Sequence, residues 1–350
     1  MAERLDLARA RVLVTGGAGF IGSNFVHRLL ARHPAAHVIV LDALTYAGRR
    51  ENLDGIPASR LTFVHGDIRD PKAVAEAMKG CAFVVNFAAE SHVDRSIEAP
   101  GEFIQTDVYG VFVLCEEARR AGVQRFLQIS TDEVYGEVLE GHSTEDWPLH
   151  PRSPYAASKA GGDRLAYACW CTYGLPVVVT RCSNNYGPRQ YPEKLVPLFV
   201  TNAIEDQPLP VYGTGRNRRD WLHVDDHCDA LITLLEFPGI DGETFNIGAQ
   251  NELDVLTITD TLLALLGKPR SLVRFVEDRP GHDRRYAVDS SKLTRVTGWK
   301  PAIPFERGIR QTVEWFQANA AWWKAIKSGE FRAYYERTYG QRKVLGEVKA

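Results

Sequence analysis

Residues 11–22 read RVLVTGGAGFIG, a short apolar and β-branched run followed by four glycines within seven positions. An apolar run of this length is typical of a buried strand, and the residues after the glycines suit a helix. The glycines allow a tight turn and bring the helix close to the strand. The stretch therefore predicts a strand, a turn and a helix in direct succession.

Similar apolar runs follow at regular distances along the chain. The predicted strands are 11–15, 37–41, 61–64, 83–87, 126–129 and 176–180. Helical segments fill the gaps, and buried strands separated by helices form parallel sheets because each connection must cross over. The sequence predicts an α/β fold of the Rossmann type, a doubly wound parallel sheet with at least six strands.

The pattern changes after Pro188, where prolines and the turn-rich run 213–215 indicate irregular connections over a cleft. We expect residues 1–187 to form the sheet domain and residues 188–350 to form most of a smaller α/β lobe that binds the substrate. The apolar run 230–237 and the strand-like run 244–247 look like returning pieces of the first domain, so the two lobes are expected to interleave near 220–248. An aromatic tail is expected to pack as helices on the smaller lobe: Trp315, Phe316, Trp322, Trp323, Tyr334 and Tyr335.

The run 17–22 matches the pattern G-x-G-x-x-G between the first strand and its helix, where free N–H groups bind a pyrophosphate. Asp42 follows Gly22 by twenty positions (42 − 22 = 20), and its carboxylate suits the ribose hydroxyls and repels a 2′-phosphate. We therefore expect the first domain to bind NAD rather than NADP. The pairs Asp67–Ile68 and Ala88–Ala89 follow later strands and should border the adenine and the diphosphate, although Asp67 alone could equally be a helix N-cap.

Two pairs of residues carry the predicted chemistry. Tyr155 and Lys159 are four positions apart, so both lie on one helix face, where the ammonium can lower the pKa of the phenol. Asp132 and Glu133 follow the fifth strand and supply an acid and a base for a second reaction at neighbouring carbons. Together they predict elimination as well as oxidation. The competing interpretations are an ordinary surface pair for the tyrosine and lysine, and a capped turn for the two carboxyls.

The composition excludes several other classes. The chain has 350 residues, a net charge of −2, 45% hydrophobic and 25% charged residues, which gives no electrostatic reason to expect nucleic acid or an anionic membrane as partner. Charged residues stand where a signal peptide needs an apolar core, so we expect a soluble, cytoplasmic protein without a membrane segment. The six cysteines form no CxxC pair, and neither disulfides nor a metal site is expected.

Several segments resemble the extended short-chain dehydrogenase/reductases. Within that family they are similar to the 4,6-dehydratases that act on dTDP-glucose. The segments run over about the first 290 residues: TGGAGFIG from Thr15, TYAGRRENL from Thr45, HGDIRD from His65, AAESHVDRSI from Ala88, STDEVYG from Ser130, SPYAASKA from Ser153, RCSNNYGPRQYPEKLVP from Arg181, RRDWLHVDDH from Arg218 and DRPGHDRRYAVD from Asp278.

The resemblance implies a role for each site residue. Tyr155, helped by Lys159, would take the proton of the sugar 4-hydroxyl, to which Thr131 hydrogen-bonds. Glu133 is the expected base at C5, and Asp132 is the expected acid for the departing 6-hydroxyl. The implied NAD-binding residues are Gly16, Gly19, Phe20, Ile21, Gly22, Asp42, Leu44, Thr45, Asp67, Ile68, Ala88, Ala89, Thr106, Tyr155, Lys159 and Asn185. The implied substrate-binding residues are Ser91, Thr131, Asn184, Lys194, Leu195, Tyr212, Arg219, Arg279 and His282.

Two positions depart from the family pattern. Val255 stands where an asparagine is usual after the NIG turn, so base recognition is expected to differ, and thymine is not distinguished from uracil. Asp107 stands where related chains often carry an asparagine.

The resemblance leaves two alternative functions open, one enzymatic and one without catalytic activity. A nucleotide-sugar 4-epimerase would use Tyr155, Lys159 and NAD but would not need the carboxyl pair. A catalytically silent, NAD-binding regulator is the other alternative. The resemblance also implies a homodimer, through helices near 102–121 and 154–173 that form a four-helix bundle.

Overall fold

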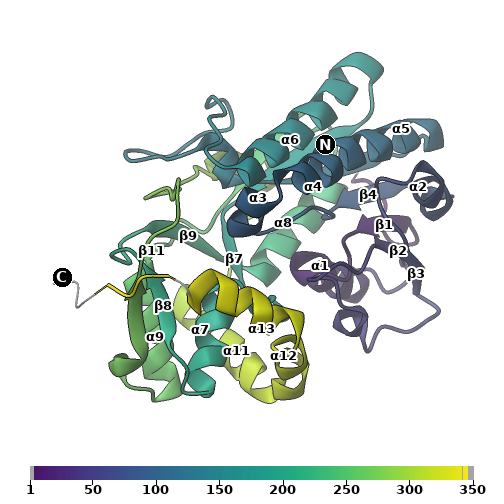
Figure 1. Cartoon of the computed structure of the whole chain (residues 1–350). Helices are drawn as coiled ribbons and strands as arrows, with labels where there is room; N and C mark the ends of the chain where they lie inside the picture. Colours follow the sequence, from purple (N-terminus) through teal and green to yellow (C-terminus); the bar gives the residue numbers. More distant parts are fainter. Residues whose placement is uncertain (1–3, 341, 346–350) are drawn as a thin grey trace.

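The computed structural model describes residues 4–340 and 342–345, and its largest element is a sheet of seven parallel strands (Figure 1). The strands run in the order β3-β2-β1-β4-β5-β6-β10, so the order reverses between β1 and β4. They are β1 (Arg11–Thr15), β2 (His37–Asp42), β3 (Leu61–His65), β4 (Phe83–Asn86), β5 (Arg125–Thr131), β6 (Val177–Cys182) and β10 (Thr244–Ile247). The predicted Rossmann-type fold is confirmed.

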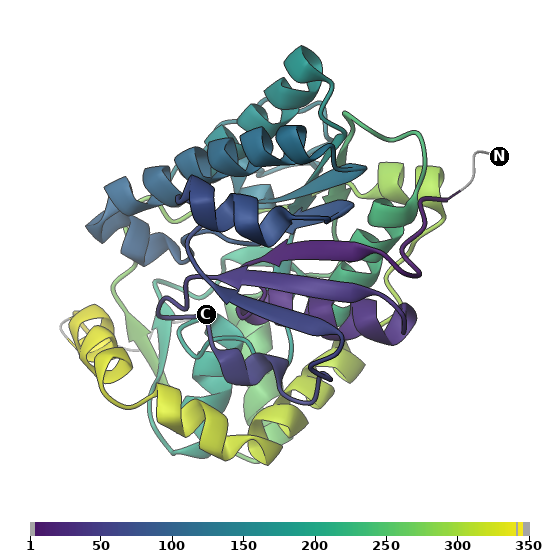
Figure 2. The ribbon, with the colours of Figure 1, turned by 90° about the vertical axis from the view of Figure 1, so that its right-hand side faces the viewer.

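Helices cover both faces of the sheet (Figure 2). Val12, Val14 and their neighbours on one face pack with helices α1 (Phe20–Arg32) and α8 (Val224–Glu236). Leu13 and its neighbours on the other face pack with α2 (Pro71–Met78), α5 (Val111–Ala121) and α6 (Pro154–Tyr173). Because both faces are buried, the strands are nearly continuous apolar runs, which is the pattern that predicted them.

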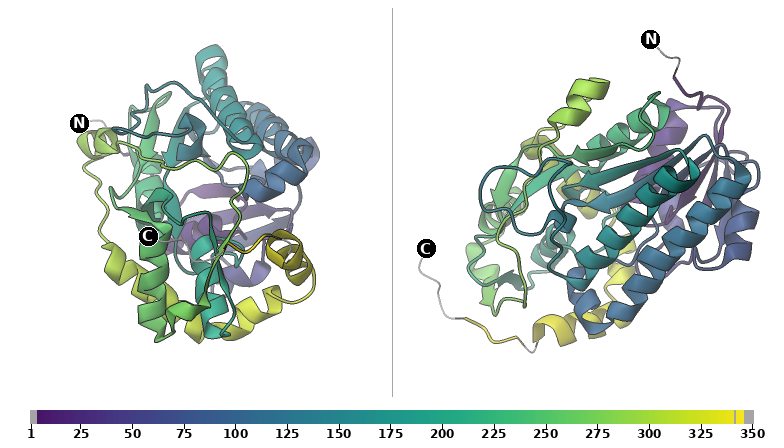
Figure 3. Two further views of the ribbon diagram at one scale, coloured as in Figure 1. Left: turned by 60° about the vertical axis from the view of Figure 1, so that its left-hand side comes forward. Right: turned by 90° about the horizontal axis from the view of Figure 1, so that it is seen from above.

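Several short helices and turns complete the sheet domain. A π-helical turn, η2, joins α4 to α5, and α5 lies against α6 in the view from above (Figure 3). These elements are η1 (Arg50–Leu53), α3 (Val93–Glu98), α4 (Pro100–Ile104), η2 (Gln105–Gly110), η3 (Asp132–Tyr135) and α10 (Ser291–Thr297).

A smaller lobe lies below the sheet domain in Figure 1 and has its own apolar core. Its helices are α7 (Leu195–Ile204), α9 (Val255–Leu266), α11 (Phe305–Ala318), α12 (Ala320–Ile326) and α13 (Glu330–Tyr335), with the short turns η4 (Arg270–Leu272) and η5 (Glu336–Gly340). Its strands are β8 (Leu209–Tyr212) and β12 (Val273–Val276), which pair in parallel, and a second small sheet holds β7 (Asn184–Tyr186), β9 (Arg218–His223) and β11 (Glu252–Asp254).

The chain crosses between the lobes more than once. After β7 to β9 it returns to the large sheet through α8 and β10, and β10 pairs with β6. The aromatic tail packs largely in the core of the smaller lobe. Two of its side chains also reach the first domain, since Trp322 Nε1 donates to Asn52 Oδ1 (3.0 Å) and the Tyr334 hydroxyl lies 3.2 Å from His92 Nδ1. Of the helices in the described ranges, none is long and apolar enough to cross a bilayer.

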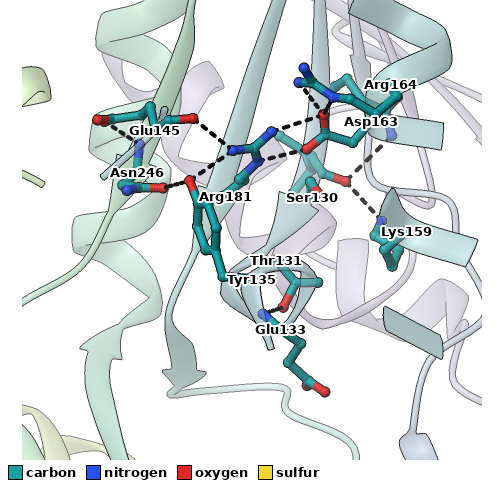
Figure 4. Close-up of polar contacts among 12 residues, drawn as sticks. Ser130, Thr131, Glu133, Tyr135, Glu145, Lys159, Asp163, Arg164, Arg181 and Asn246 are labelled. Carbon is teal, nitrogen blue, oxygen red and sulfur yellow. Dashed lines mark hydrogen bonds and ion pairs between the residues drawn. The ribbon is translucent and has the colours of Figure 1, made fainter. Parts of the chain in front are cut away.

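A buried arginine ties three elements of the sheet domain together (Figure 4). Arg181 on β6 donates from Nε to Asp163 Oδ2 on α6 (2.8 Å) and from Nη1 to the hydroxyl of Tyr135 on η3 (2.8 Å). The Tyr135 hydroxyl in turn donates to Asn246 Oδ1 on β10 (2.8 Å). The side chains of Arg181 and Asp163 are only 2% and 0% exposed, so neither charge can be compensated by water.

We expect Asp163→Asn to lower the free energy of unfolding by about 3–5 kcal/mol, because it leaves the buried guanidinium without its anion. Equilibrium unfolding in urea measures the change. The matched control is Arg164→Gln, which removes the other cation that pairs with Asp163. Because the Arg164 side chain is 44% exposed, this variant should lower the free energy of unfolding by less than about 1 kcal/mol. Equal losses in the two variants would contradict the assignment of Arg181 as the essential partner.

Candidate active site

Two adjoining cavities open at the carboxyl ends of the large sheet. The first runs from the glycine turn after β1 to Tyr155 and Lys159, and the second lies between η3 and the smaller lobe. Both are bordered by Glu133, Asn184, Glu193 and Lys194, so they meet there. Open α/β sheets bind ligands at this edge, where the strand order reverses.

The sequence-predicted residues divide between these cavities. Except for Leu44, the residues expected to bind NAD all line the first cavity, which also contains Thr131, Asp132, Glu133 and Ser91. The second cavity is lined by Asn184, Lys194, Leu195, Tyr212, Arg219, Arg279 and His282, as expected for a substrate site. Leu44 packs against the apolar core of the sheet domain instead.

The turn after β1 leaves no room for side chains. Gly16 has a φ of +66°, and a β-carbon there would lie 2.7 Å from the backbone nitrogen of Ala88. A β-carbon on Gly22 would lie 2.3 Å from the carbonyl oxygen of Gly16. Only glycine fits at these positions, and the space is a cradle in which backbone can approach an anion closely.

Asp42 fixes the shape of this cradle. Its Oδ2 accepts from the amide of Ala18 and its Oδ1 from the amide of Leu44, both at 2.8 Å. Burial raises the pKa of the Asp42 carboxyl, while the two amides act in the opposite direction. The carboxylate oxygens stand at the cavity wall with lone pairs left to accept hydroxyl groups.

Asp67 is not a helix N-cap. Its Oδ2 forms an ion pair with Arg69 Nη2 (2.7 Å), and its Oδ1 accepts from the Arg69 amide. The N-cap of α2 is Asp70, which accepts from the amide of Lys72 (2.9 Å). The alternative that the sequence left open for Asp67 is therefore excluded.

Asp132 and Glu133 begin η3, and Thr131 caps it by accepting from the Glu133 amide (3.3 Å). Asp132 is 3% exposed, and its Oδ2 has no hydrogen-bonding partner among the described residues. Burial, followed by the charge of Glu133, raises the pKa of Asp132 well above its usual value, against the opposing charge of Arg219. Burial also raises the pKa of Glu133, against Arg279, Arg219 and Lys194. Burial thus favours the acid form of Asp132.

Tyr155 and Lys159 project from α6 into the first cavity. Lys159 is 7% exposed and donates from Nζ to the carbonyl of Ile129 at the end of β5 (2.8 Å). Burial, and then the charges of Glu133 and Asp107, raise the pKa of Tyr155 well above its usual value. In this structure the protein's own groups therefore do not produce the lowering of the Tyr155 pKa that the lysine spacing predicts.

Cations surround the second cavity. Lys194 is enclosed there, and burial lowers its pKa. Arg219 donates from Nη2 to the carbonyl of Asp283 (2.9 Å) and stacks on the ring of Tyr286 at 4.2 Å. Arg279 lies 3.9 Å from Asp94. Guanidinium groups next to a lysine form a site that suits a diphosphate.

Three of the implied residues also form hydrogen bonds within the protein. The Asn185 side chain donates to the carbonyl of Ser183 (2.9 Å) and its Oδ1 lies 3.0 Å from His227 Nδ1. His282 Nδ1 lies 2.7 Å from Asp278 Oδ1. The carbonyl of Ser91 accepts from the Tyr46 hydroxyl (2.8 Å).

Several residues that line the two cavities were not predicted from the sequence. Tyr46 and Glu193 line the first cavity, and Tyr286 and Tyr339 line the second. Tyr286 and Glu193 fall inside segments that resemble the family, but no spacing marks them as site residues. Tyr339 comes from the aromatic tail, which was predicted as packing alone. In residues 4–340 and 342–345 no group of three His, Cys, Asp or Glu side chains is placed to hold a metal ion.

Of the two departures from the family pattern, Val255 lines a cavity, whereas Asp107 is buried outside both cavities. Val255 begins α9 and lines the second cavity. Asp107 lies in the π-helical turn η2, where Oδ1 accepts from the Glu90 amide (2.8 Å) and Oδ2 accepts from the Ser158 hydroxyl (2.6 Å). Burial, opposed by the charge of Lys159, raises the pKa of Asp107 to about 6.

Comparison with known proteins identifies close relatives. A family model described as GDP-mannose 4,6 dehydratase matches residues 13–312. A dTDP-glucose 4,6-dehydratase of Streptomyces niveus is 50% identical over 323 residues, covering 91% of this chain and 96% of that protein. The dTDP-glucose 4,6-dehydratase 1 of Escherichia coli K12 is 47% identical, covering 95% of this chain and 99% of that protein.

Solved structures agree with these matches. The crystal structure of DesIV, a dTDP-glucose 4,6-dehydratase from Streptomyces venezuelae with NAD and TYD bound, is 52% identical with a TM-score of 0.88, covering 91% of this chain and 100% of that one. A UDP-glucose 4-epimerase of Thermus thermophilus in complex with NAD is 34% identical with a TM-score of 0.82, covering 88% of this chain and 99% of that one. The epimerase shares the fold but less of the sequence.

We expect Asp107→Asn to stabilise the protein at pH 8 and to have little effect near pH 4. The pKa of Asp107 rises from 3.8 in an ordinary setting to about 6 in the fold. Between these values the folded protein binds a proton that the unfolded chain lacks, so stability falls as pH rises from about 4 to 6 and stays lower above. An asparagine avoids this loss of about 2–3 kcal/mol.

Urea unfolding at the two pH values measures the effect. The control is Asp54→Asn, since Asp54 is an exposed carboxyl, and it should match the parent at both pH values. A pH-independent change in Asp107→Asn would show that the carboxyl does not titrate as described.

Proposed function

The chain belongs to the dTDP-glucose 4,6-dehydratases, within the group covered by the GDP-mannose 4,6 dehydratase model, and we propose that it converts dTDP-glucose into dTDP-4-keto-6-deoxyglucose. The observation that carries this is the pair of buried Asp132 and half-buried Glu133, which lines the same cavity as Tyr155 and Lys159. A hydride transfer needs only Tyr155 and Lys159. Asp132 and Glu133 provide the acid and the base for loss of water.

NAD is the cofactor of this reaction, as it is in the related crystal structures. The glycine cradle fits a pyrophosphate, and the Asp42 carboxylate fits ribose hydroxyls. NAD, when bound, accepts the hydride of C4 and returns it to C6. We assign the first domain, 1–187 with its returning pieces near 220–248, to NAD, and most of 188–350 to the nucleotide sugar.

The protein's own residues move the protons. Tyr155 takes the proton of the 4-hydroxyl, with Lys159 beside it and Thr131 as the hydrogen-bonding partner of that hydroxyl. The 4-ketone makes the C5 hydrogen acidic, so Glu133 can remove it as a proton. Asp132, whose pKa is raised by burial, gives its proton to the departing 6-hydroxyl, which leaves as water. Glu133 then returns a proton to C5.

The cations of the second cavity hold the nucleotide diphosphate in this proposal. Lys194, Arg219 and Arg279 bind its oxygens, because paired guanidinium donors match phosphate geometry. Tyr212 lines the same cavity and would border the base, with its ring held by Tyr339 and the Arg342 guanidinium. Val255, in place of an asparagine, removes an amide from this cavity.

One assay tests the proposal and the base preference together. Purified protein is incubated separately with dTDP-, UDP-, GDP- and CDP-glucose, and the masses of the products are measured by mass spectrometry. Loss of water from dTDP-glucose supports the dehydratase. An isomer of unchanged mass would mean an epimerase, and NAD binding without turnover of any sugar would mean a regulator.

We also propose a homodimer in the cytoplasm. Five large apolar side chains of α3 to α6 and η2 are 44–56% exposed. A group of exposed apolar side chains is typical of an interaction surface, whereas a single one is not. The five are Ile97, Ile104, Tyr109, Phe112 and Tyr173. The same helices of a second copy would cover them in a four-helix bundle. The six cysteines are free thiols, as suits a reducing compartment.

Glu133→Gln should retain oxidation at C4 but lose dehydration, because an amide cannot remove the C5 proton. The absorbance of the reduced cofactor should persist, and mass spectrometry should find a 4-keto sugar that has kept its oxygen at C6. The control is Glu137→Gln, since Glu137 pairs with Arg152 outside the cavities (3.2 Å). Dehydration by Glu133→Gln at the parent rate would remove Glu133 from its role.

Light scattering should give a mass near 78.2 kDa, twice the chain mass of 39.1 kDa (2 × 39.1 = 78.2). Phe112→Glu should shift the protein to a monomer, because it places a charge in the apolar patch. Leu139→Glu changes another exposed apolar residue, 58% exposed and outside these helices, and should stay dimeric. A parent mass of 39.1 kDa would refute the dimer.

A further inference from the structure

Behind Glu133 lies a short chain of polar groups that the catalytic roles above do not use. The hydroxyl of Tyr286 donates to Asp283 Oδ2 at 2.5 Å and lies 3.5 Å from Glu133 Oε2. Asp283 Oδ1 is 2.6 Å from Nη1 of Arg152. The Arg152 side chain is 46% exposed, whereas that of Asp283 is 4% exposed. The chain of groups therefore runs from the half-buried carboxyl of Glu133 toward the exposed side chain of Arg152.

The hydrogen-bond lengths show where the hydroxyl proton lies. A phenol has one hydrogen to donate, and the short distance assigns it to Asp283 rather than to Glu133. The oxygen of Tyr286 then keeps lone pairs that face Glu133. An ionised Glu133 has no hydrogen to offer them, but a protonated Glu133 has one. The arrangement thus stabilises Glu133 after it has taken a proton.

The ring of Tyr286 is held independently of its hydroxyl. It is 4% exposed, and the guanidinium of Arg219 stacks on it at 4.2 Å. The charged groups that face Glu133 are Arg279, Arg219 and Lys194, which oppose the effect of burial on its pKa, and Asp283, which adds to it. Asp283 is thus the nearest anion in this chain that can receive a proton from Glu133 through Tyr286.

We propose that Tyr286 and Asp283 form a proton outlet for Glu133, which lets the hydrogen taken from C5 of the sugar exchange with water. The inference rests on the proposed dehydratase function and names the route of one of its protons. Tyr286 and Asp283 are positioning residues, since neither needs to touch the sugar.

The transfer balances without any further reactant. The O–H bond of protonated Glu133 breaks as a new O–H bond forms on Tyr286. The original O–H bond of Tyr286 breaks as one forms on Asp283, which changes from an anion to a neutral acid. Asp283 then releases its proton to water beside Arg152. The reverse sequence brings a solvent proton to Glu133 for return to C5, and no electrons are gained or lost.

The test follows deuterium on C5. The parent protein, given dTDP-glucose deuterated at C5 in ordinary water, should form a dehydrated product that has lost the label. Tyr286→Phe keeps the ring and its stacking but has no hydroxyl, so its product should retain most of the label. If Tyr286 had a merely structural role, the product of Tyr286→Phe would lose the label as the parent's product does.

A second variant and a control complete the experiment. Asp283→Asn keeps the shape of the acceptor but cannot take up the proton, so it should also retain the label. Tyr186→Phe removes the hydroxyl of another buried tyrosine, one without a hydrogen-bonding partner among the described residues, and its product should lose the label as the parent's does.

Three results would overturn the outlet. They are label retention by the parent, undiminished label loss in a variant that still forms product, and failure of both folded variants to oxidise C4, because the outlet acts only after that step. Absence of any dehydrated product from the parent would instead refute the function on which the inference rests.

Discussion

The buried ion pair between Arg181 and Asp163 holds the reactive groups of this protein in register. Asp163 belongs to the helix that carries Tyr155 and Lys159, and the same guanidinium binds Tyr135 in the turn that begins with Asp132 and Glu133. The two reactive pairs therefore sit on separate elements with one shared anchor. Arg181 and Asp163 line neither of the two cavities, so their ion pair can be rigid without obstructing a ligand.

Burial sets the chemistry of the cleft as much as residue identity does. It raises the pKa of Asp132, Glu133 and Tyr155 together. For Asp132 this direction suits an acid, but for Tyr155 it opposes the required base. The same desolvation therefore favours the acid form that Asp132 needs and disfavours the anionic form that Tyr155 needs.

Much of the fold could be predicted from the sequence, because strands buried on both faces are apolar throughout and the glycine turn has few alternatives. The cradle residues were predictable for the same reason, since Gly16 and Gly22 have no space for a β-carbon. The contact between Tyr286 and Glu133 was not predictable, because it joins residues 153 positions apart. Burial raises the pKa of Tyr155 in the protein without cofactor, and this burial could not be predicted from the i, i+4 spacing, which shows only the lysine.

The placement of β10 affects how the chain is made. The edge strand of the large sheet is encoded after β7, β8 and β9, so a ribosome has finished β6 more than sixty residues before the strand that covers it (244 − 182 = 62). Until then β6 presents unpaired backbone groups at the sheet's open edge, where a strand of another nascent chain can pair with them. Interleaving the lobes thus exposes the emerging polypeptide to misassembly during translation, and protection by a chaperone would matter most in that interval.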